Sequence, residues 1–283
     1  MLIRILTSIA LVATAANLLA SPEVPGAKQT HPIALVGGTI HTVSGKTLTN
    51  ATLLFDNGKI TAVGTGFDLP QKCEVISIKG KHVFPGMLDA YTNMGLVEIN
   101  AVRASKDENE TGSFNPNVRA EVAVNPDSEI IPTTRSNGVL LCLAAPSGGT
   151  VSGRSAVLQL DGWTYEDLTI RSAAGLHIKW PLMAVVSDWW VTSSAKEQIA
   201  SREKSLAKLE EQFTTARLYD KARRSNPDTL VDMKWESMRA VLAGDIPIIV
   251  NADNANQIQS AVAFAVRQKV KLIINGGYDA IYC

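Results

Sequence analysis

The sequence predicts an α/β protein in which a small β unit precedes a larger region of alternating strands and helices. Three observations carry this prediction. Residues 31–84 form short runs rich in β-branched residues that end in glycine, which is typical of strands and turns. After Pro85, strand-like runs alternate with stretches of helical periodicity. Strand-helix-strand alternation indicates parallel strands joined by right-handed crossovers.

The β unit is expected to be antiparallel with alternating faces. Its three runs read "IALVGGTIHTVSG", "ATLLFDNGKITAVGTG" and "CEVISIKGKHVFPG". The tetrapeptide "DNGK" predicts a hairpin, because Asn57 and Gly58 accept the positive φ angles of a type I′ turn.

Six strands are expected in the larger region, with a long helical stretch between the fourth and the fifth. The strands read "GMLDAY", "GVLLCLAAP", "SAVLQLDG", "LHIKWP", "IPIIVNAD" and "VKLIING". The helical stretch covers residues 193–242, and a second helix within it is expected to carry Leu230, Met233 and Met238 inward and to stop at Gly244. A third helix, "NANQIQSAVAFAVRQ", separates the last two strands. Residues 100–125, rich in Asp and Asn, predict a long surface loop at the mouth of the sheet.

Composition excludes several classes of protein. The 283 residues carry 27 basic and 27 acidic side chains, so neither nucleic acid nor an anionic membrane surface is an expected partner. The three cysteines are too few and too widely spaced to predict a disulfide framework.

Residues 1–20 have the layout of a secretory signal peptide, with Arg4 followed by an apolar run. We therefore expect an exported protein, periplasmic or secreted, with no membrane association after cleavage near Ala15 or Ala20. A retained membrane anchor is the alternative, but the run is shorter than the roughly 20 residues that span a bilayer.

The passage "GKHVFPGMLDA", which leads from the β unit into the larger region, resembles the amidohydrolase superfamily, nearest its imidazolonepropionase-like branch. "GDIPIIVNADNANQIQSAVAFAVRQKVKLIINGGYDA" and the glycine-rich "PSGGTVSGRSAVLQLDGWTYEDL" also resemble it, so the likeness covers residues 33–278. It implies a TIM-type (β/α)8 barrel over residues 85–283, preceded over 31–84 by part of a composite β-sandwich domain. It also implies a zinc-dependent hydrolase of C–N bonds in cyclic or other non-peptide amides.

The resemblance breaks at the metal ligands. The family has two histidines at the end of the first barrel strand, where a period of two lets both imidazoles reach one ion. Tyr91 and Asn93 stand at these positions, Asn251 replaces the fifth-strand histidine, and Asn275 or Gly276 replaces the sixth. A phenol and an amide oxygen are poor zinc ligands, so no bound cofactor is expected. Lys179 is a weak counterpart of the strand-four ligand.

We expect the former ligand positions at the barrel mouth to contact a small polar ligand instead. They are Tyr91, Asn93, Asn251 and Asn275. Asp89 and Asp253 are expected to support them. Asp89 is expected to form a hydrogen bond. Asp253 follows the fifth strand and could reach the barrel mouth, but a helix N-cap at Asp253 or Asn254 is the simpler interpretation. The lone His177 is expected to be a satisfied structural residue.

The last two barrel strands and the aspartate that ends the family's final strand have no counterpart before Cys283, so the sequence predicts an incomplete barrel. A fragmentary record, a disrupted gene and a short form that closes by forming a homo-oligomer each account for this, and an open sheet edge favours pairing between chains. Three functions stay open: a hydrolase, a non-catalytic ligand-binding protein, and a degenerate fragment. Whether the chain is an enzyme is therefore undecided at this point.

Overall fold

The computed structural model describes residues 25–283, and the predicted signal peptide lies outside them. Within residues 25–283 no helix combines the length and the apolar character needed to cross a membrane. The described chain divides into two compact units, one ending at Met87 but including 138–140, and one containing 88–137 and 141–283.

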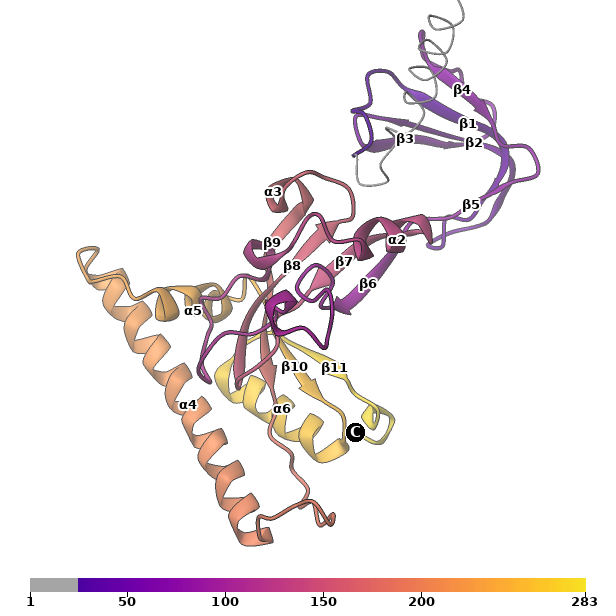
Figure 1. Ribbon diagram of the computed structural model, residues 1–283. Helices are drawn as coiled ribbons and strands as arrows, with labels where there is room; N and C mark the ends of the chain where they lie inside the picture. The colour runs from indigo at the N-terminus through magenta and orange to yellow at the C-terminus, as the bar shows by residue number, and fades with distance from the viewer. Residues whose placement is uncertain (1–24) are drawn as a thin grey trace, which may run out of the picture. The chain divides into compact units, whose positions relative to one another are not determined.

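The first unit is a five-stranded sheet (Figure 1). Its strands are β1 (Ile33–Ile40), β2 (Leu48–Asp56), β3 (Lys59–Gly64), β4 (Glu74–Ser77) and β5 (His82–Val83). The predicted hairpin is confirmed, because β2 and β3 are antiparallel and Asn57 and Gly58 have φ of 49° and 71°. The prediction that the whole unit is antiparallel is wrong, since β4 and β5 both pair with β1 in parallel.

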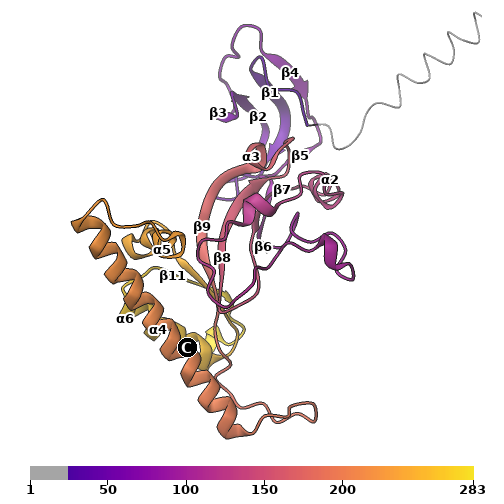
Figure 2. The same ribbon diagram turned by 60° about the vertical axis from the view of Figure 1, so that its left-hand side comes forward.

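The second sheet has six strands in the order β11-β10-β9-β8-β7-β6 and curls into a half-barrel, in which the long strands β8 and β9 bend together (Figure 2). The strands are β6 (Met87–Thr92), β7 (Val139–Ala144), β8 (Val151–Gln159), β9 (Thr169–Lys179), β10 (Ile248–Ala252) and β11 (Leu272–Gly276).

Parallel pairing is confirmed only where helices connect the strands. β9, β10 and β11 are parallel, whereas β7–β8 and β8–β9 are antiparallel, so the prediction of a wholly parallel sheet is wrong. The reason is the length of the connections. A parallel crossover needs about a dozen residues or more. Residues 145–150 and 160–168, which join the antiparallel strands, are too short to form one.

In residues 25–283 three long helices connect the last three strands: α4 (Ala195–Ser225) and α5 (Met233–Ala243) lie between β9 and β10, and α6 (Ala255–Gln268) lies between β10 and β11. A capping box between Ser194 and Glu197 begins α4, and a second one between Asn254 and Gln257 begins α6. The N-cap of α6 is therefore Asn254 and not Asp253. Gly244, at φ 79°, ends α5 as predicted.

The shorter helical elements lie mostly in the connections. They are η2 (Arg103–Ser105), η3 (Ala120–Ala123), α2 (Ile130–Ser136), α3 (Tyr165–Leu168) and η4 (Ala280–Tyr282). The segment 100–125 is less of a surface loop than predicted, because Phe114, Ala120 and Glu121 are buried.

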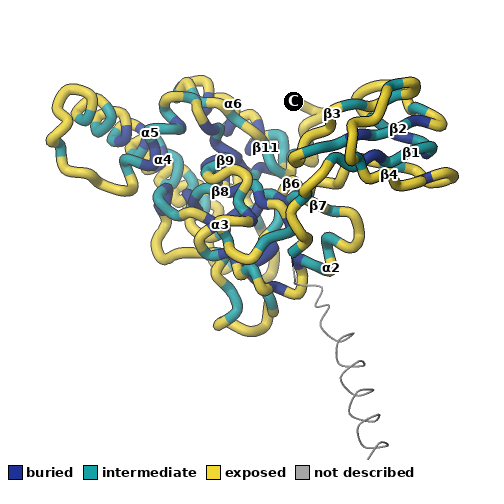
Figure 3. The backbone as a smooth tube through the Cα atoms, turned by 90° about the horizontal axis from the view of Figure 1, so that it is seen from above, coloured by how far each residue is buried: buried dark blue, intermediate teal, exposed yellow. Residues whose placement is uncertain are grey.

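The main core lies between one face of the half-barrel and the long helices. Leu176, Ile178, Ile248 and Val250 meet Leu209, Phe213, Met238 and Phe264 there. Figure 3 shows buried positions, in dark blue, along the central strands of this sheet and along α6. Met238 confirms the expected inward face of α5, but Leu230 and Met233 are 89% and 65% exposed, because the helix starts only at Met233 and Leu230 precedes its N-cap, Asp232.

Because side chains alternate along a strand, the residues between the core positions face the inside of the half-barrel. On β9 these are His177 and Lys179, and on β10 they are Ile249 and Asn251. The sheet thus separates an apolar layer against the helices from a polar inner face at its carboxyl end.

Candidate functional site

Three of the four expected ligand-contacting residues meet at the carboxyl end of the half-barrel. Asn251 and Asn275 are partners in the β10–β11 register, and Asn275 Nδ2 donates to Asn251 Oδ1 at 2.8 Å. Asn251 Nδ2 donates to the hydroxyl of Tyr91 at 3.3 Å. The result is a chain of polar side chains that runs from β11 through β10 to β6.

Asn93 lies apart from this chain. β6 ends at Thr92, so the period of two no longer applies at residue 93, which begins a turn. Its Nδ2 donates to Glu108 Oε2 at 3.4 Å, and its carbonyl accepts from the backbone of Leu96.

His177 is buried next to Tyr91, with 5.7 Å between the two ring centroids. Only 1% of the residue is exposed, and neither ring nitrogen has a hydrogen-bond partner in the described part of the chain. Burial lowers the pKa of His177 to about 4, because charging the ring away from water is unfavourable. The expectation of a satisfied structural histidine is therefore wrong in one respect: the residue is buried and neutral, but it is unpaired.

Asp89 supports Tyr91 from the same strand. Its Oδ1 accepts a hydrogen bond from the backbone N–H of Tyr91 at 3.2 Å. On β7, burial raises the pKa of the Cys142 thiol to about 12, and the negative charge of Asp89 raises it further in the same direction. β7 therefore holds an uncharged, buried thiol rather than a nucleophilic thiolate.

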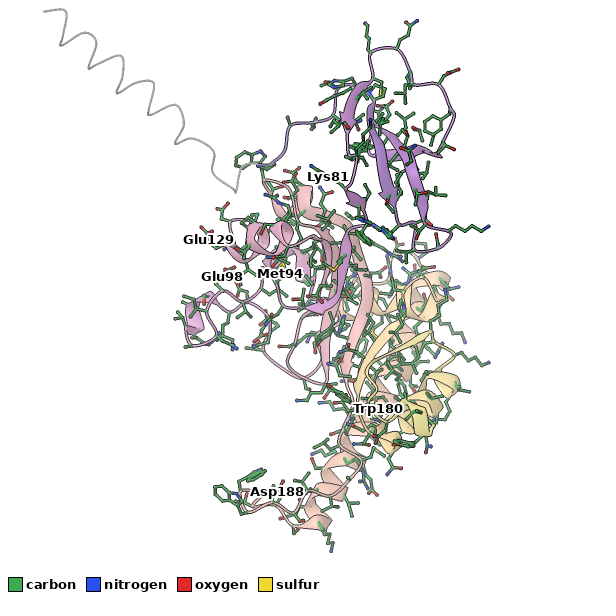
Figure 4. All side chains as sticks on the ribbon, turned by 90° about the vertical axis from the view of Figure 1, so that its right-hand side faces the viewer. Lys81, Met94, Glu98, Glu129, Trp180 and Asp188 are labelled. Carbon is green, nitrogen blue, oxygen red and sulfur yellow. The ribbon has the colours of Figure 1, made fainter. Side chains whose placement is uncertain are left out.

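A cavity of about 720 Å³ opens beside Asn251. It is bounded by the loop 147–150, by Lys179 and Asp253 at the ends of β9 and β10, and by residues 180–182. Trp180, labelled in Figure 4, lies beside α6 and packs its ring against Phe264 at 5.3 Å. The site therefore combines a firm apolar wall with a few polar groups, which is the usual composition of a small-molecule pocket.

The loop 147–150 is held in place by the irregular segment before it. Ser147 N donates to Glu108 O at 2.7 Å, and Thr150 N donates to Ser113 O at 2.9 Å. Gly149 has φ 63°, and a Cβ there would lie 2.9 Å from the carbonyl oxygen of Gly112. Only glycine fits this close backbone approach without displacing the loop.

Lys179 and Asp253 place opposite charges on the same cavity. Lys179 is the register partner of Asn251 on the neighbouring strand, and Asp253 follows the end of β10. In residues 25–283 neither side chain forms an ion pair or a hydrogen bond, with the other or with any further group. The cavity thus presents one ammonium and one carboxylate that are both available to a ligand.

The side chains at this site do not fit a zinc ion. Zinc sites in proteins are built from imidazole, thiolate and carboxylate ligands, commonly three or four of them. No group of three such side chains comes together in the described residues. The donors at the strand ends are a phenol, two amides and an ammonium, and Tyr91 and both asparagines already hydrogen-bond to one another.

The sequence prediction gave too little weight to Lys179, and it assigned no place at the site to the glycine-rich loop 147–150 or to Gln257. The signal for Lys179 was present, because it follows His177 by two positions in "LHIKWP" and must share its face. Gln257, which is buried and lines the cavity, donates from Nε2 to Trp180 O at 3.3 Å. That contact joins positions 77 apart and had no signal in the local sequence.

Neither a protein-family model nor a curated protein sequence matches this chain. Its structure is similar to that of an amidohydrolase from Thermotoga maritima, with a TM-score of 0.73 and 23% identity. The similarity covers 86% of this chain and 63% of that one, so the chain spans less than two thirds of its neighbour's length. A prolidase crystallised with N-methylphosphonate-L-proline matches with a TM-score of 0.39 and 13% identity, over 84% of this chain and 59% of that one. The chain has an amidohydrolase-type fold.

Proposed function

We propose that this amidohydrolase-type protein binds a small polar ligand in the cavity at the carboxyl ends of β9 and β10, without a zinc-dependent step. One observation carries the proposal. Asn251 belongs both to the hydrogen-bonded chain with Tyr91 and Asn275 and to the lining of the cavity. The residue at a former ligand position is thus fixed by its neighbours and faces the space where a ligand fits.

The chemistry of Asn251 suits an amide-bearing ligand. Its Nδ2 carries two hydrogens and its Oδ1 two lone pairs, and the contacts to Tyr91 and Asn275 use one of each. The remaining hydrogen and lone pair match the carbonyl and N–H of an amide. Because the side chain is held at both ends, little conformational entropy is lost on binding.

The fold likeness favours a second function, the hydrolysis of a C–N bond in a small or cyclic amide. The Thermotoga maritima protein of similar structure is an amidohydrolase. Fold alone does not deliver chemistry, however, and hydrolysis by metal-activated water needs ligands that the strand ends lack. Metal content and turnover separate the two functions.

The test uses the full chain purified from zinc-supplemented cells. We expect well below one zinc per chain by elemental analysis. By isothermal titration we expect at least one member of a panel of small amides, neutral and charged, to bind. Asn251→Leu should abolish that binding, whereas Asn256→Leu, an exposed asparagine of α6 outside the cavity, should leave it intact.

One tightly held zinc per chain together with zinc-dependent turnover of these amides would overturn the proposal in favour of the hydrolase. Absence of binding by the whole panel would overturn it as well.

Export is also a proposal, supported by the apolar run in residues 1–20. The intact mass of the protein recovered from its native cells tests it, since a mature chain should start after Ala15 or Ala20. A mass that includes Met1 would contradict cleavage.

A further inference from the structure

We infer that the cavity beside Asn251 takes a zwitterion, a dipeptide-sized molecule with a carboxylate at one end, an ammonium at the other and an amide between them. The inference rests on the proposed function, because it names the class of ligand for the same cavity. It is carried by the two unpaired charges that line one cavity and by Asn251, the polar residue whose place in the sheet lies between them.

Lys179 is the group that would receive the carboxylate. It stands at the last position of β9, its backbone N–H donates to Thr150 O at 2.9 Å, and its side chain lines the cavity. The strand and the anchored loop fix the backbone of Lys179, so only the side chain has to be ordered by a ligand. A hydrogen bond from an ammonium to a carboxylate is charge-assisted and stronger than a neutral one.

The loop 147–150 adds backbone hydrogen-bond donors on the side of the cavity where Lys179 lies. Gly148 and Gly149 have φ of 84° and 63° and line the cavity, and neither N–H has an acceptor within the described residues. Backbone N–H groups in such a turn are suited to an anion. They lie next to Thr150, whose carbonyl accepts from Lys179.

Asp253 is the group that would receive the ammonium. It follows β10 by one residue and is exposed to the cavity, while its backbone is held by bonds to Gln257 and Asp279. Gly276 of β11 lies against the Asp253 carboxylate, and a Cβ at position 276 would collide with it. The absence of a side chain at 276 leaves room for the carboxylate to reach the cavity.

The two charges line one cavity and yet do not neutralise one another. A lysine and an aspartate that line the same cavity without pairing leave both charges open to a molecule that carries the complementary charge at each end. Asn251 lies between them, because it is the register partner of Lys179 and precedes Asp253 by two positions. An amide in the middle of the ligand would meet the free hydrogen and lone pair of Asn251.

Four compounds with the same central amide test the inference: glycylglycine, N-acetylglycine, glycine N-methylamide and N-methylacetamide. They carry both charges, the carboxylate only, the ammonium only and no charge. We expect glycylglycine to bind most tightly by isothermal titration, with a loss of about tenfold for each charge removed, since hydrogen bonds to charged groups contribute more than neutral ones.

Two variants test which residue binds the carboxylate end of the ligand and which binds the ammonium end. Lys179→Met should remove the preference for glycylglycine over glycine N-methylamide and keep the preference over N-acetylglycine. Asp253→Asn should do the reverse. Lys196→Met and Asp245→Asn change exposed charges that do not line the cavity and should alter neither preference.

Equal binding of all four compounds would overturn the zwitterion inference and leave the proposed function standing. Binding of glycylglycine that neither variant weakens would also overturn it. If none of the four compounds binds but another small amide of the panel does, the inference alone fails. If the whole panel fails to bind, the inference fails together with the proposed function.

Discussion

Asn251 and Tyr91 are joined by a hydrogen bond of 3.3 Å although 160 positions separate them in the chain. Their strands, β10 and β6, are not neighbours, because β9, β8 and β7 lie between them in the sheet. On a flat sheet four strand spacings would amount to roughly 19 Å. The contact is therefore a direct consequence of the curl of the half-barrel, which brings the ends of distant strands together.

Replacement of Tyr91 by phenylalanine should lower the free energy of unfolding by about 0.5–1 kcal/mol, since it removes one hydrogen bond at a partly exposed position. Urea unfolding followed by circular dichroism measures this. Tyr278→Phe is the matched control, because that tyrosine is 86% exposed and should not change stability. Equal effects of the two changes would mean that the contact between Tyr91 and Asn251 contributes nothing.

His177 should make the protein less stable as the pH falls from about 6.5 to about 4. Burial lowers the pKa of His177 from 6.5 to about 4 in the folded chain, so the unfolded chain binds the proton more readily in that range. The stability is fully present above pH 6.5 and is lost as the pH falls, by roughly 3 kcal/mol in total. Unfolding free energies measured between pH 4 and pH 7 test this.

His177→Leu should remove that part of the pH dependence and raise stability at neutral pH, because two unpaired ring nitrogens are no longer buried. His31→Leu is the control, since His31 is exposed and contacts Glu74. If the pH profiles of the two variants coincide, His177 is not the group that titrates.

Cys142 should stay unmodified in the folded protein at pH 8. It is fully buried, and burial raises its pKa to about 12, so almost no thiolate is present. Cys283 is exposed and should react readily. Peptide mapping after treatment with iodoacetamide, with and without urea, gives the extent of labelling at each cysteine. Labelling of Cys142 at the rate of Cys283 without urea would show that β7 is not packed as described.

Gly149→Ala should cost more stability than Gly58→Ala. Both glycines have positive φ, so both changes impose about 1–2 kcal/mol of backbone strain. At position 58 nothing lies within 4 Å of the added carbon, whereas at position 149 it meets the backbone of Gly112. We expect a clearly lower melting temperature for Gly149→Ala, together with weaker ligand binding because the loop 147–150 must shift. Equal melting temperatures of the two variants would mean that the loop 147–150 can shift to accept the added carbon without loss of stability.

Periodicity predicted the polar cluster but not the cavity. Asn251 and Asn275 could be placed at strand ends from their runs, and parallel strands bring such ends to one edge. The cavity depends instead on the loop 147–150, which is fixed by Glu108 O and Ser113 O. These are backbone contacts between distant segments, and backbone acceptors leave no mark in the amino-acid sequence.

The direction of the central strands was predicted wrongly although the sequence contained the signal. The short connections 145–150 and 160–168 leave no room for crossover helices, and only the connections that contain α4, α5 and α6 allow parallel pairing. Strands and helices alternate from β9 to β11, but they do not alternate from β7 to β9, where the prediction assumed the same pattern. The prediction that Leu230 faces inward from a helix was wrong for a related reason, because helical periodicity alone does not show where a helix begins.

The mixed direction of the sheet also sets the order in which it forms. β8 can pair with β7 and β9 across short connections, while β10 can join β9 only after the whole segment 180–247 has been arranged. Closing a longer loop costs more entropy, and contacts distant in sequence form more slowly. In pulse-labelling hydrogen exchange during refolding, the amides of β8 should therefore gain protection before those of β10. The half-barrel then grows outward from its antiparallel middle, and the cavity between the ends of β9 and β10 is among the last features to appear.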